Sequence, residues 1–258
     1  MKTSYLAGML LLTTACTTSP LGHRQLKLLP QDELQQMGGT AYQKIRSETR
    51  VVQDPGVVGY VQCVARAITS QVDSKTNWEV TVFQDDSANA FALPGGKIGV
   101  NSGMLKVAEN QDQLASVLGH EVAHVVAEHQ NARISAAYAA EATQSLLSAL
   151  ASNGGNSGQI LGLLGVGVQY GVLMPYGRSQ ESEADLLGQR YMADAGFDPR
   201  ASVSLWQNMS RTQGSGPPAF LSTHPSHGSR IERLTEQMPE AMQRYEKAGT
   251  AGRRSKCG

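Results

Sequence analysis

Two histidines and a glutamate near the middle of the chain have a spacing that suits one metal ion. They form the run His120-Glu121-Val122-Ala123-His124, an H-E-x-x-H pattern. Residues four apart lie on one face of a helix, so both imidazoles can bind the same zinc ion while Glu121 contacts a zinc-bound water. Shuffled sequences of this composition contain the pattern in roughly 0.7% of cases, which makes coincidence uncommon. The run therefore indicates metal-assisted hydrolysis.

A pair of carboxylates later in the chain offers the third ligand. A catalytic zinc site keeps one position for water and takes three protein ligands. Glu181 and Asp185 lie four apart in a predicted helix over 179–195, so one can bind the metal while the other holds a ligand imidazole. A solvated acidic helix face has the same spacing, although neighbouring Ala and Leu residues indicate partial burial. Glu183, two positions from Glu181, is expected to point elsewhere.

The elements predicted around these residues are mostly helices. The segment after Gln111 has apolar residues at helical spacing and is expected to form one long helix or two in succession. Two short alternating segments, 77–84 and 97–100, are typical of strands. The fold class is therefore α+β, mostly α with a small β-sheet, and the motif lies on a central helix. Capping signals and apolar periodicity predict helices at 55–72, 111–150, 179–195, from 199 onward and 226–244.

The first residues have the layout of a secretory leader. Residues 1–15 contain one lysine, a short apolar stretch and small residues before Cys16. The apolar stretch is shorter than the ~20 residues that span a bilayer. Thr14-Ala15-Cys16 resembles the bacterial lipobox, in which the cysteine is lipidated, although Thr13 stands where leucine is usual. Secretion with a free Cys16 is the alternative. The expected organisation is a signal peptide (1–15), a linker from the lipid anchor (16–30), a metallopeptidase domain (31–246) and a C-terminal tail (247–258).

Charge and cysteine content limit the remaining choices. The chain has 22 Lys and Arg against 22 Asp and Glu, which disfavours an electrostatic nucleic-acid binder. Two cysteines, Cys63 and Cys257, remain beyond Cys16, and disulfides persist outside the cytoplasm. A disulfide between them is one hypothesis. A buried Cys63 with a free thiol at Cys257 is the other.

Four segments, in this order, resemble one family of zinc metallopeptidases. The family is the gluzincin group that contains HtpX, the CAAX prenyl proteases, the mitochondrial Oma-type proteases and the bacterial envelope proteases BepA and LoiP. The likeness covers most of residues 30–240 and is greatest to the short LoiP-like lipoproteins, which have no tetratricopeptide domain. The matching segments are Asn89–Gly96 with Ile98 and Asn101–Leu105, Leu118–His124, Ser179–Asp185, and Thr223-His224-Pro225 with Arg230-Ile231.

The resemblance implies roles for single residues. It makes His120, His124 and Glu181 the ligands of one Zn²⁺, and Glu121 the catalytic base. Asp185 would orient a ligand imidazole. His224 would lie at the cleft, where it donates a hydrogen bond to the developing oxyanion or sits over the zinc at rest. A histidine that only caps a helix is the alternative for this position.

The resemblance also places a substrate-binding segment just before a strand. An extended peptide could pair with such a strand edge through main-chain hydrogen bonds, with weak sequence preference. Glycines also occur in any hairpin or bulge, which is the simpler explanation for the pair at its end. The residues concerned are Asn89, Ala90, Phe91, Gly95 and Gly96.

The other histidines are expected to lie outside the site. His129 is nine residues from His120, which is about 180° around a continuous helix. His23 and His227 are expected at the surface.

Motifs and leader together predict a zinc endopeptidase of the bacterial envelope that cuts unfolded or misassembled envelope proteins. Thr17 rather than Asp follows Cys16, which by similarity to bacterial lipoproteins favours the outer membrane, facing the periplasm. Outer-membrane assembly machinery is a further expected partner. One alternative is an envelope chaperone whose site is gated by segment 152–178. Another is a zinc hydrolase with a non-peptide substrate.

Overall fold

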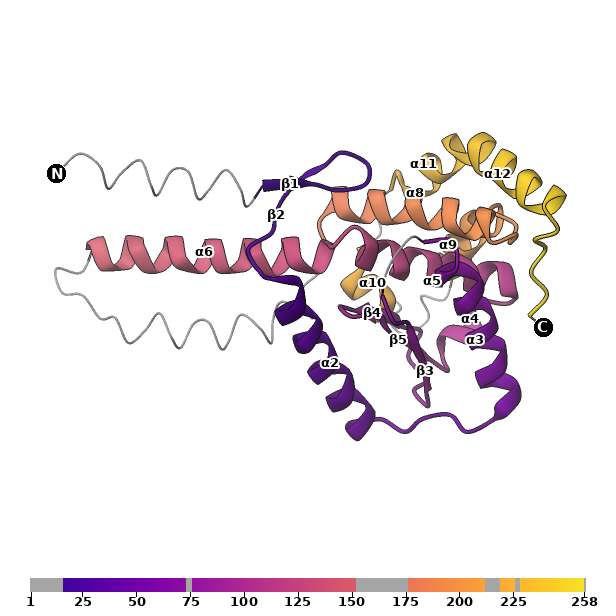
Figure 1. Cartoon of the computed structure of the whole chain (residues 1–258), viewed down its shortest axis with the longest axis horizontal. Coiled ribbons are helices and arrows are strands. Elements are labelled where there is room, and N and C mark those ends of the chain that lie inside the picture. The colour runs from indigo at the N-terminus through magenta and orange to yellow at the C-terminus, as the bar shows by residue number, and fades with distance from the viewer. Residues whose placement is uncertain (1–15, 73–75, 152–175, 212–218, 226–227, 258) are drawn as a thin grey trace.

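The computed structural model describes residues 16–72, 76–151, 176–211, 219–225 and 228–257. The expected leader, His227 and most of the proposed gate lie outside the described residues. The described chain is mainly helical with a small sheet, which confirms the predicted fold class (Figure 1).

The sheet has three short strands beside the central helix. They are β3 (Glu79–Phe83), β4 (Ala90–Leu93) and β5 (Lys97–Asn101), in the order β3-β5-β4. β5 runs parallel to β3 and antiparallel to β4, so β4 forms one edge. The turn between β4 and β5 contains Gly95 and Gly96 at φ 80° and 77°, a conformation that glycine adopts without strain. In the sequence, β4 lies between the two predicted strands, 77–84 and 97–100.

Most predicted helices are present, and several observed helices were not anticipated. Asp54 caps α3 (Pro55–Thr69) by accepting hydrogen bonds from two backbone N–H groups of its first turn. The longest unanticipated helix, α2 (Gln31–Glu48), is mostly polar, and its buried residues are Leu34, Gly38 and Tyr42. The remaining small helices are α4 (Met104–Val107), α9 (Ala201–Arg211), α10 (Ala219–Thr223), α11 (Arg230–Glu236) and α12 (Met238–Thr250).

The long segment after Gln111 forms two helices rather than one. α5 (Gln111–Val126) begins at Asn110, whose side chain accepts two backbone hydrogen bonds. α6 (His129–Ala151) starts after Glu128, which has φ 53°. Figure 1 shows the far part of α6 projecting away from the other described elements. The left-handed residue ends α5 and turns the chain, so positions after it do not follow the helical spacing of α5.

α8 (Arg178–Asp194) crosses α5 at very short distance. A Cβ at Gly119 would lie 2.7 Å from the carbonyl oxygen of Gly188, and a Cβ at Gly188 would lie 2.6 Å from the His120 nitrogen. Only glycine at both positions lets the two backbones approach this closely. The crossing therefore brings the carboxylates of α8 against the histidines of α5.

The segment expected as a linker forms a hairpin against the domain. β1 (Cys16–Thr18) and β2 (Arg24–Leu26) pair antiparallel. Gln25 Nε2 donates to the carbonyl of Ala127 at 2.9 Å, and the Leu28 N–H donates to Ser135 Oγ at 2.8 Å. The hairpin thus contacts the joint between α5 and α6.

The C-terminal tail is held against α3 and α5. Cys63 on α3 and Cys257 form a disulfide with an S–S distance of 2.07 Å. The Cys257 N–H donates to Gln111 Oε1 at 2.8 Å, and Gln111 Nε2 donates to the Ser255 carbonyl at 2.9 Å. Residues expected as a tail therefore close a loop that spans most of the domain.

Replacing Cys63 with Ser is expected to lower the free energy of unfolding by about 2–5 kcal/mol, because the closed loop of 194 residues restricts the unfolded chain. Urea titration of the soluble mature chain, without reductant, measures this change. Cys16→Ser is the matched control, since Cys16 is exposed and unpaired. Reductant should destabilise the wild type and leave Cys63→Ser unchanged; equal midpoints for all three proteins would contradict the prediction.

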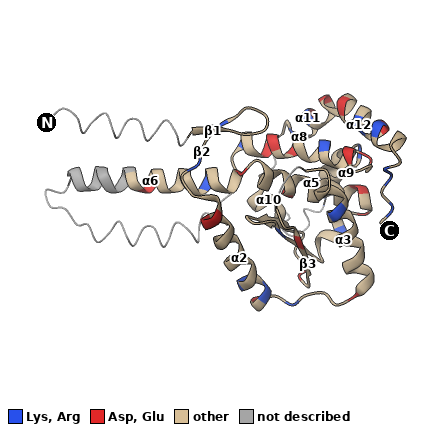
Figure 2. Ribbon diagram, in the orientation of Figure 1, with Lys and Arg blue, Asp and Glu red and all other residues tan. Residues whose placement is uncertain are grey.

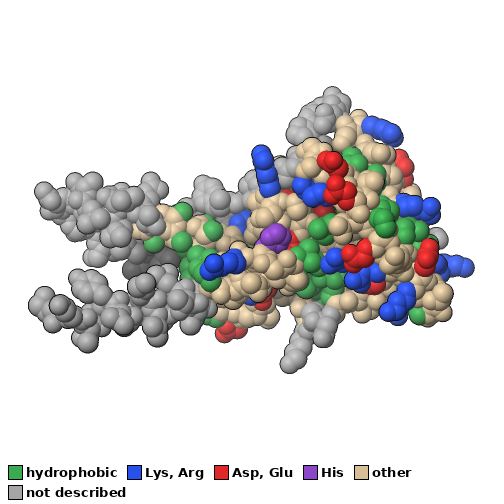
Figure 3. Space-filling model, turned by 90° about the horizontal axis from the view of Figure 1, so that it is seen from above, with side chains coloured by type: hydrophobic (Ala, Val, Ile, Leu, Met, Phe, Trp, Pro, Cys, Tyr) green, Lys and Arg blue, Asp and Glu red, His purple; other side chains and the backbone are tan. Residues whose placement is uncertain are grey.

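Figure 2 shows basic and acidic residues distributed along the ribbon. Basic and acidic side chains are mixed on the face of the described residues that Figure 3 shows. Within the described ranges, no helix combines the length and apolar character needed to cross a bilayer.

Candidate metal centre

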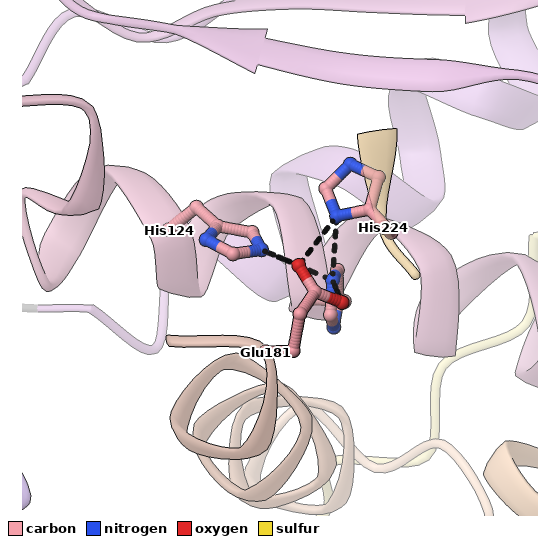
Figure 4. Close-up of side chains that lie close together, drawn as sticks. His124, Glu181 and His224 are labelled. Atoms are coloured by element: carbon pink, nitrogen blue, oxygen red, sulfur yellow. Dashed lines mark hydrogen bonds and ion pairs between the residues drawn. The ribbon is translucent and has the colours of Figure 1, made fainter. Parts of the chain in front are cut away.

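Four buried side chains from three elements converge on one point. His120 and His124 come from α5, Glu181 comes from the first turn of α8, and His224 follows α10. Figure 4 shows His124, Glu181 and His224 directed at one another. One ligand atom from each of the four residues lies within 4.8 Å of the others. The structure therefore brings together the two histidines and the carboxylate that the sequence predicts, with His224, which the resemblance places at the cleft.

The separations of these atoms suit a tetrahedral zinc ion. Nε2 of His124 lies 3.1 Å from Nε2 of His120 and 3.4 Å from Oε1 of Glu181. Nδ1 of His224 lies 3.1 Å from His120 Nε2 and 3.0 Å from Glu181 Oε1. Ligands about 2.1 Å from a tetrahedral zinc are about 3.4 Å apart. The residues present fit zinc, and His224 lies where an open catalytic site keeps water.

Asp185 and Arg230 contact the ligands His120 and Glu181. Asp185 Oδ1 lies 2.9 Å from His120 Nδ1, the ring nitrogen that faces away from the cluster. Arg230 Nε donates to Asp185 Oδ2 at 2.5 Å, and its Nη2 donates to Glu181. The guanidinium also lies 3.9 Å from the ring centre of Trp206. One buried arginine thus joins both carboxylates of α8.

The predicted base lies beside the cluster. Glu121 is 1% exposed, and its Oε2 accepts a hydrogen bond from the Ala92 N–H of β4 at 3.0 Å. Its Oε1 lies 3.2 Å from His224 Nε2. Burial raises the pKa of Glu121, although nearby histidines partly oppose the shift.

Burial and neighbouring charges move the pKa values of the ligands in different directions. Burial lowers the pKa of His124 well below its usual value, which favours the neutral, metal-binding imidazole. Burial also lowers the pKa of His120, but Asp185 and Glu181 outweigh it, so the net shift is upward. The pKa of Glu181 is lowered despite burial, because three histidines surround the carboxylate.

The expectation that His129 lies outside the site is wrong. His129 is 1% exposed, and its Nδ1 lies 2.9 Å from Nδ1 of His124. Its Nε2 lies 3.3 Å from Oε2 of Glu183. The prediction assumed one continuous helix, whereas the chain turns at Glu128. Glu183 does point away from the cluster, as predicted, but it is buried rather than solvated.

The sequence matches the model of peptidase family M48 over residues 58–238. The chain belongs to peptidase family M48. This match confirms the family recognised in the four motifs, and the metal-binding cluster agrees with it.

Relatives of this M48 chain carry two kinds of name. Mitochondrial metalloendopeptidase OMA1 of Schizosaccharomyces pombe is 36% identical over 216 residues, which cover 81% of this chain and 62% of the relative. The putative beta-barrel assembly-enhancing protease of Vibrio cholerae is 34% identical over 209 residues, 77% of this chain and 43% of the relative. The beta-barrel assembly-enhancing protease of Escherichia coli is 29% identical over 224 residues, 82% and 46%. The chain thus spans less than two thirds of the length of each.

A cleft of about 260 Å³ opens beside Glu121 and His224. Of the predicted substrate-binding residues, Asn89 and Phe91 line it. Ala90 is fully buried, and Gly95 lines a separate hollow. Most other lining residues are apolar and come from α2, the sheet and α6: Leu34, Met37, Ile45, Phe83, Leu93 and Ile134.

Tyr176, which lies in the segment proposed as a gate, covers one ligand. Its ring stacks on His124 with centres 3.7 Å apart and planes at 21°. The guanidinium of Arg133 lies 3.9 Å from the centre of the Tyr176 ring. Burial raises the pKa of Tyr176 to about 12, so its hydroxyl stays protonated. The sequence analysis named this segment but did not single out Tyr176, because a single tyrosine there has no periodic signal.

Proposed function

We propose that this chain is a zinc-dependent endopeptidase of the bacterial cell envelope that hydrolyses peptide bonds in unfolded or misassembled envelope proteins. The observation that carries the proposal is the buried His120, His124 and Glu181 cluster with the Glu121 carboxylate beside it. This donor set is the one that catalytic zinc sites use, and a carboxylate at that place serves as the base of a metalloprotease.

Zinc in this site would polarise the scissile carbonyl and lower the pKa of the attacking water. Glu121 accepts the proton of that water and then delivers it to the leaving amine. Glu121 lies buried beside the cluster, which places its carboxylate within reach of both proton transfers. No covalent intermediate with the protein is required.

His224 has two roles that its position supports. At rest its Nδ1 fills the fourth corner of the cluster, 3.1 Å from His120 Nε2. If the loop after α10 swings the ring away, an imidazole N–H beside Glu121 can donate to the developing oxyanion. Both roles require a side chain at the edge of the cleft, where His224 lies.

The outer edge of β4 is the proposed substrate-binding edge. The Ala92 carbonyl, which does not face β5, accepts a hydrogen bond from Gln130 Nε2 at 3.1 Å, and the Ala92 N–H donates to Glu121. An extended substrate that pairs with this edge would replace these contacts. The apolar lining of the cleft favours substrates with exposed apolar side chains, as unfolded proteins have.

The envelope setting rests on the leader and on two relatives. Residues 1–15 followed by Cys16 are typical of a bacterial lipoprotein signal. The Vibrio and Escherichia relatives are named for beta-barrel assembly, which agrees with an outer-membrane lipoprotein that faces the periplasm and works beside assembly machinery. Lipid labelling of Cys16 in cells, absent from Cys16→Ser, tests the anchor.

A gated chaperone is the second candidate. Tyr176 stacks on His124 and His224 occupies the fourth corner, so both side chains would have to move before a substrate reached the metal position. A protein that mainly binds its clients would keep that state. Client binding that survives replacement of Glu121, without any cleavage by the wild type, would favour this function.

Removal of zinc is expected to abolish cleavage of an unfolded protein such as casein by the soluble mature chain. A chelator should stop cleavage and added zinc should restore it, because the proposed reaction needs the Lewis acid that His120, His124 and Glu181 would hold. His124→Ala should contain much less than one zinc per chain and show no cleavage. His23→Ala is the matched control, since His23 lies on the exposed hairpin. Full cleavage in chelator, or by His124→Ala, would exclude the proposed reaction.

A further inference from the structure

A line of three buried polar side chains runs from α8 to the metal cluster. Glu183 Oε2 lies 3.3 Å from His129 Nε2, and His129 Nδ1 lies 2.9 Å from His124 Nδ1. His124 then presents Nε2 to the cluster. Glu183, His129 and His124 are each no more than 1% exposed. Such groups are kept in a folded protein only with defined partners.

The line has one consistent arrangement of protons. A carboxylate only accepts hydrogen bonds, so His129 Nε2 carries a proton and donates to Glu183. In neutral His129 the other nitrogen, Nδ1, is then an acceptor. His124 must therefore donate from Nδ1, which leaves the lone pair of its Nε2 directed at the metal position.

Glu183 is itself held by the N-terminal hairpin. Its Oε1 accepts a hydrogen bond from the Leu21 N–H at 2.8 Å, and Ser19 also donates to the carboxylate. The other oxygen, Oε2, faces His129 Nε2. Both oxygens of Glu183 therefore have hydrogen-bond donors within reach.

The geometry points to Glu183 and His129 as positioning residues that set the tautomer and ring orientation of His124 for zinc. This proposal rests on the assignment of His124 as a zinc ligand. Asp185 contacts the corresponding nitrogen of His120 directly, at 2.9 Å. For His124 the same task is divided between a histidine and a carboxylate, and the carboxylate is tied to the segment that follows Cys16. The hairpin next to the proposed membrane anchor thus contacts the support of the metal site.

Chelator competition for zinc in the soluble mature chain tests the proposal. His129→Leu and Glu183→Gln are expected to weaken zinc binding about 10–100-fold, the usual effect of losing a group that orients a ligand. His129→Gln should restore most of the affinity, because its amide can donate to Glu183 and accept from His124. A purely structural role would not distinguish Gln from Leu in this way. Glu232→Gln, at an exposed position of α11, is the control.

Three outcomes would overturn the proposal. If His129→Leu and Glu183→Gln bind zinc within twofold of the wild-type affinity while His124→Ala loses zinc, the positioning role of Glu183 and His129 is excluded. The assignment of His124 as a ligand then still holds. Equal weakening in His129→Gln and His129→Leu, with equal loss of thermal stability in chelator, would show a packing role. Retention of zinc by His124→Ala would overturn both the assignment of His124 as a ligand and the positioning role of Glu183 and His129. If His129→Leu does not fold, Glu183→Gln and His129→Gln carry the same comparison.

Discussion

Glu121→Gln is expected to lower the rate of casein cleavage by about 10²–10⁴-fold while zinc binding stays close to one ion per chain. The amide of Gln can still accept the hydrogen bond from the Ala92 N–H through its oxygen, so the local packing should persist. It cannot accept the proton of the attacking water. Initial cleavage rates and zinc content of the same preparations measure both parts of the expectation.

The matched control for this change is Glu232→Gln, which removes an exposed carboxylate and should leave the rate unchanged. Loss of zinc in Glu121→Gln would mean that the carboxylate supports the metal rather than the proton transfer. Cleavage within tenfold of the wild type, at equal zinc content, would assign the base to another group.

Arg230→Leu is expected to lower the free energy of unfolding by about 3–5 kcal/mol, because the carboxylates of Asp185 and Glu181 would remain buried without their cation. Arg230 is 2% exposed and also packs on Trp206, so water cannot replace it without rearrangement. Urea titration in chelator measures the loss without the added stability that bound zinc supplies.

Arg244→Leu is the matched control on α12. Arg244 also pairs with two carboxylates, Asp194 and Glu240, but its side chain is 39% exposed. Exposed pairs contribute about 0–1 kcal/mol, so this variant should differ little from the wild type. Similar losses in Arg230→Leu and Arg244→Leu would show that the Arg230 network adds no more than a surface pair.

The parts of the site that depend on one helix were predictable. His120 and His124 share a face of α5, and Glu181 and Asp185 share a face of α8, because a helix repeats every 3.6 residues. The prediction for His129 was wrong because it applied this repeat beyond Glu128. That residue, with φ 53°, interrupts the helix. A backbone reversal of this kind has no reliable signal in residue types other than glycine.

Helices rich in apolar residues were also predicted, whereas α2 was missed, although its few apolar residues Leu34, Met37, Ala41 and Ile45 recur at helical spacing. Its polar residues dominate, and it is held by a few contacts such as Gly38, where a Cβ would lie 2.2 Å from the Pro94 carbonyl oxygen. The sequence did not decide whether 111–150 forms one helix or two, because no glycine or proline lies between α5 and α6.

The sequence alone determined which reactive groups share an element: two imidazoles and a base on one helix, and two carboxylates on another. It also contains the leader pattern before Cys16. Only the tertiary structure decided which distant groups join these side chains. His224 lies 104 positions from His120, and Arg230 lies 45 positions from Asp185, yet each is in direct contact with its partner. Such contacts arise from the glycine-mediated crossing of α5 and α8 and from packing of the C-terminal helices, which depend on the whole core rather than on local spacing.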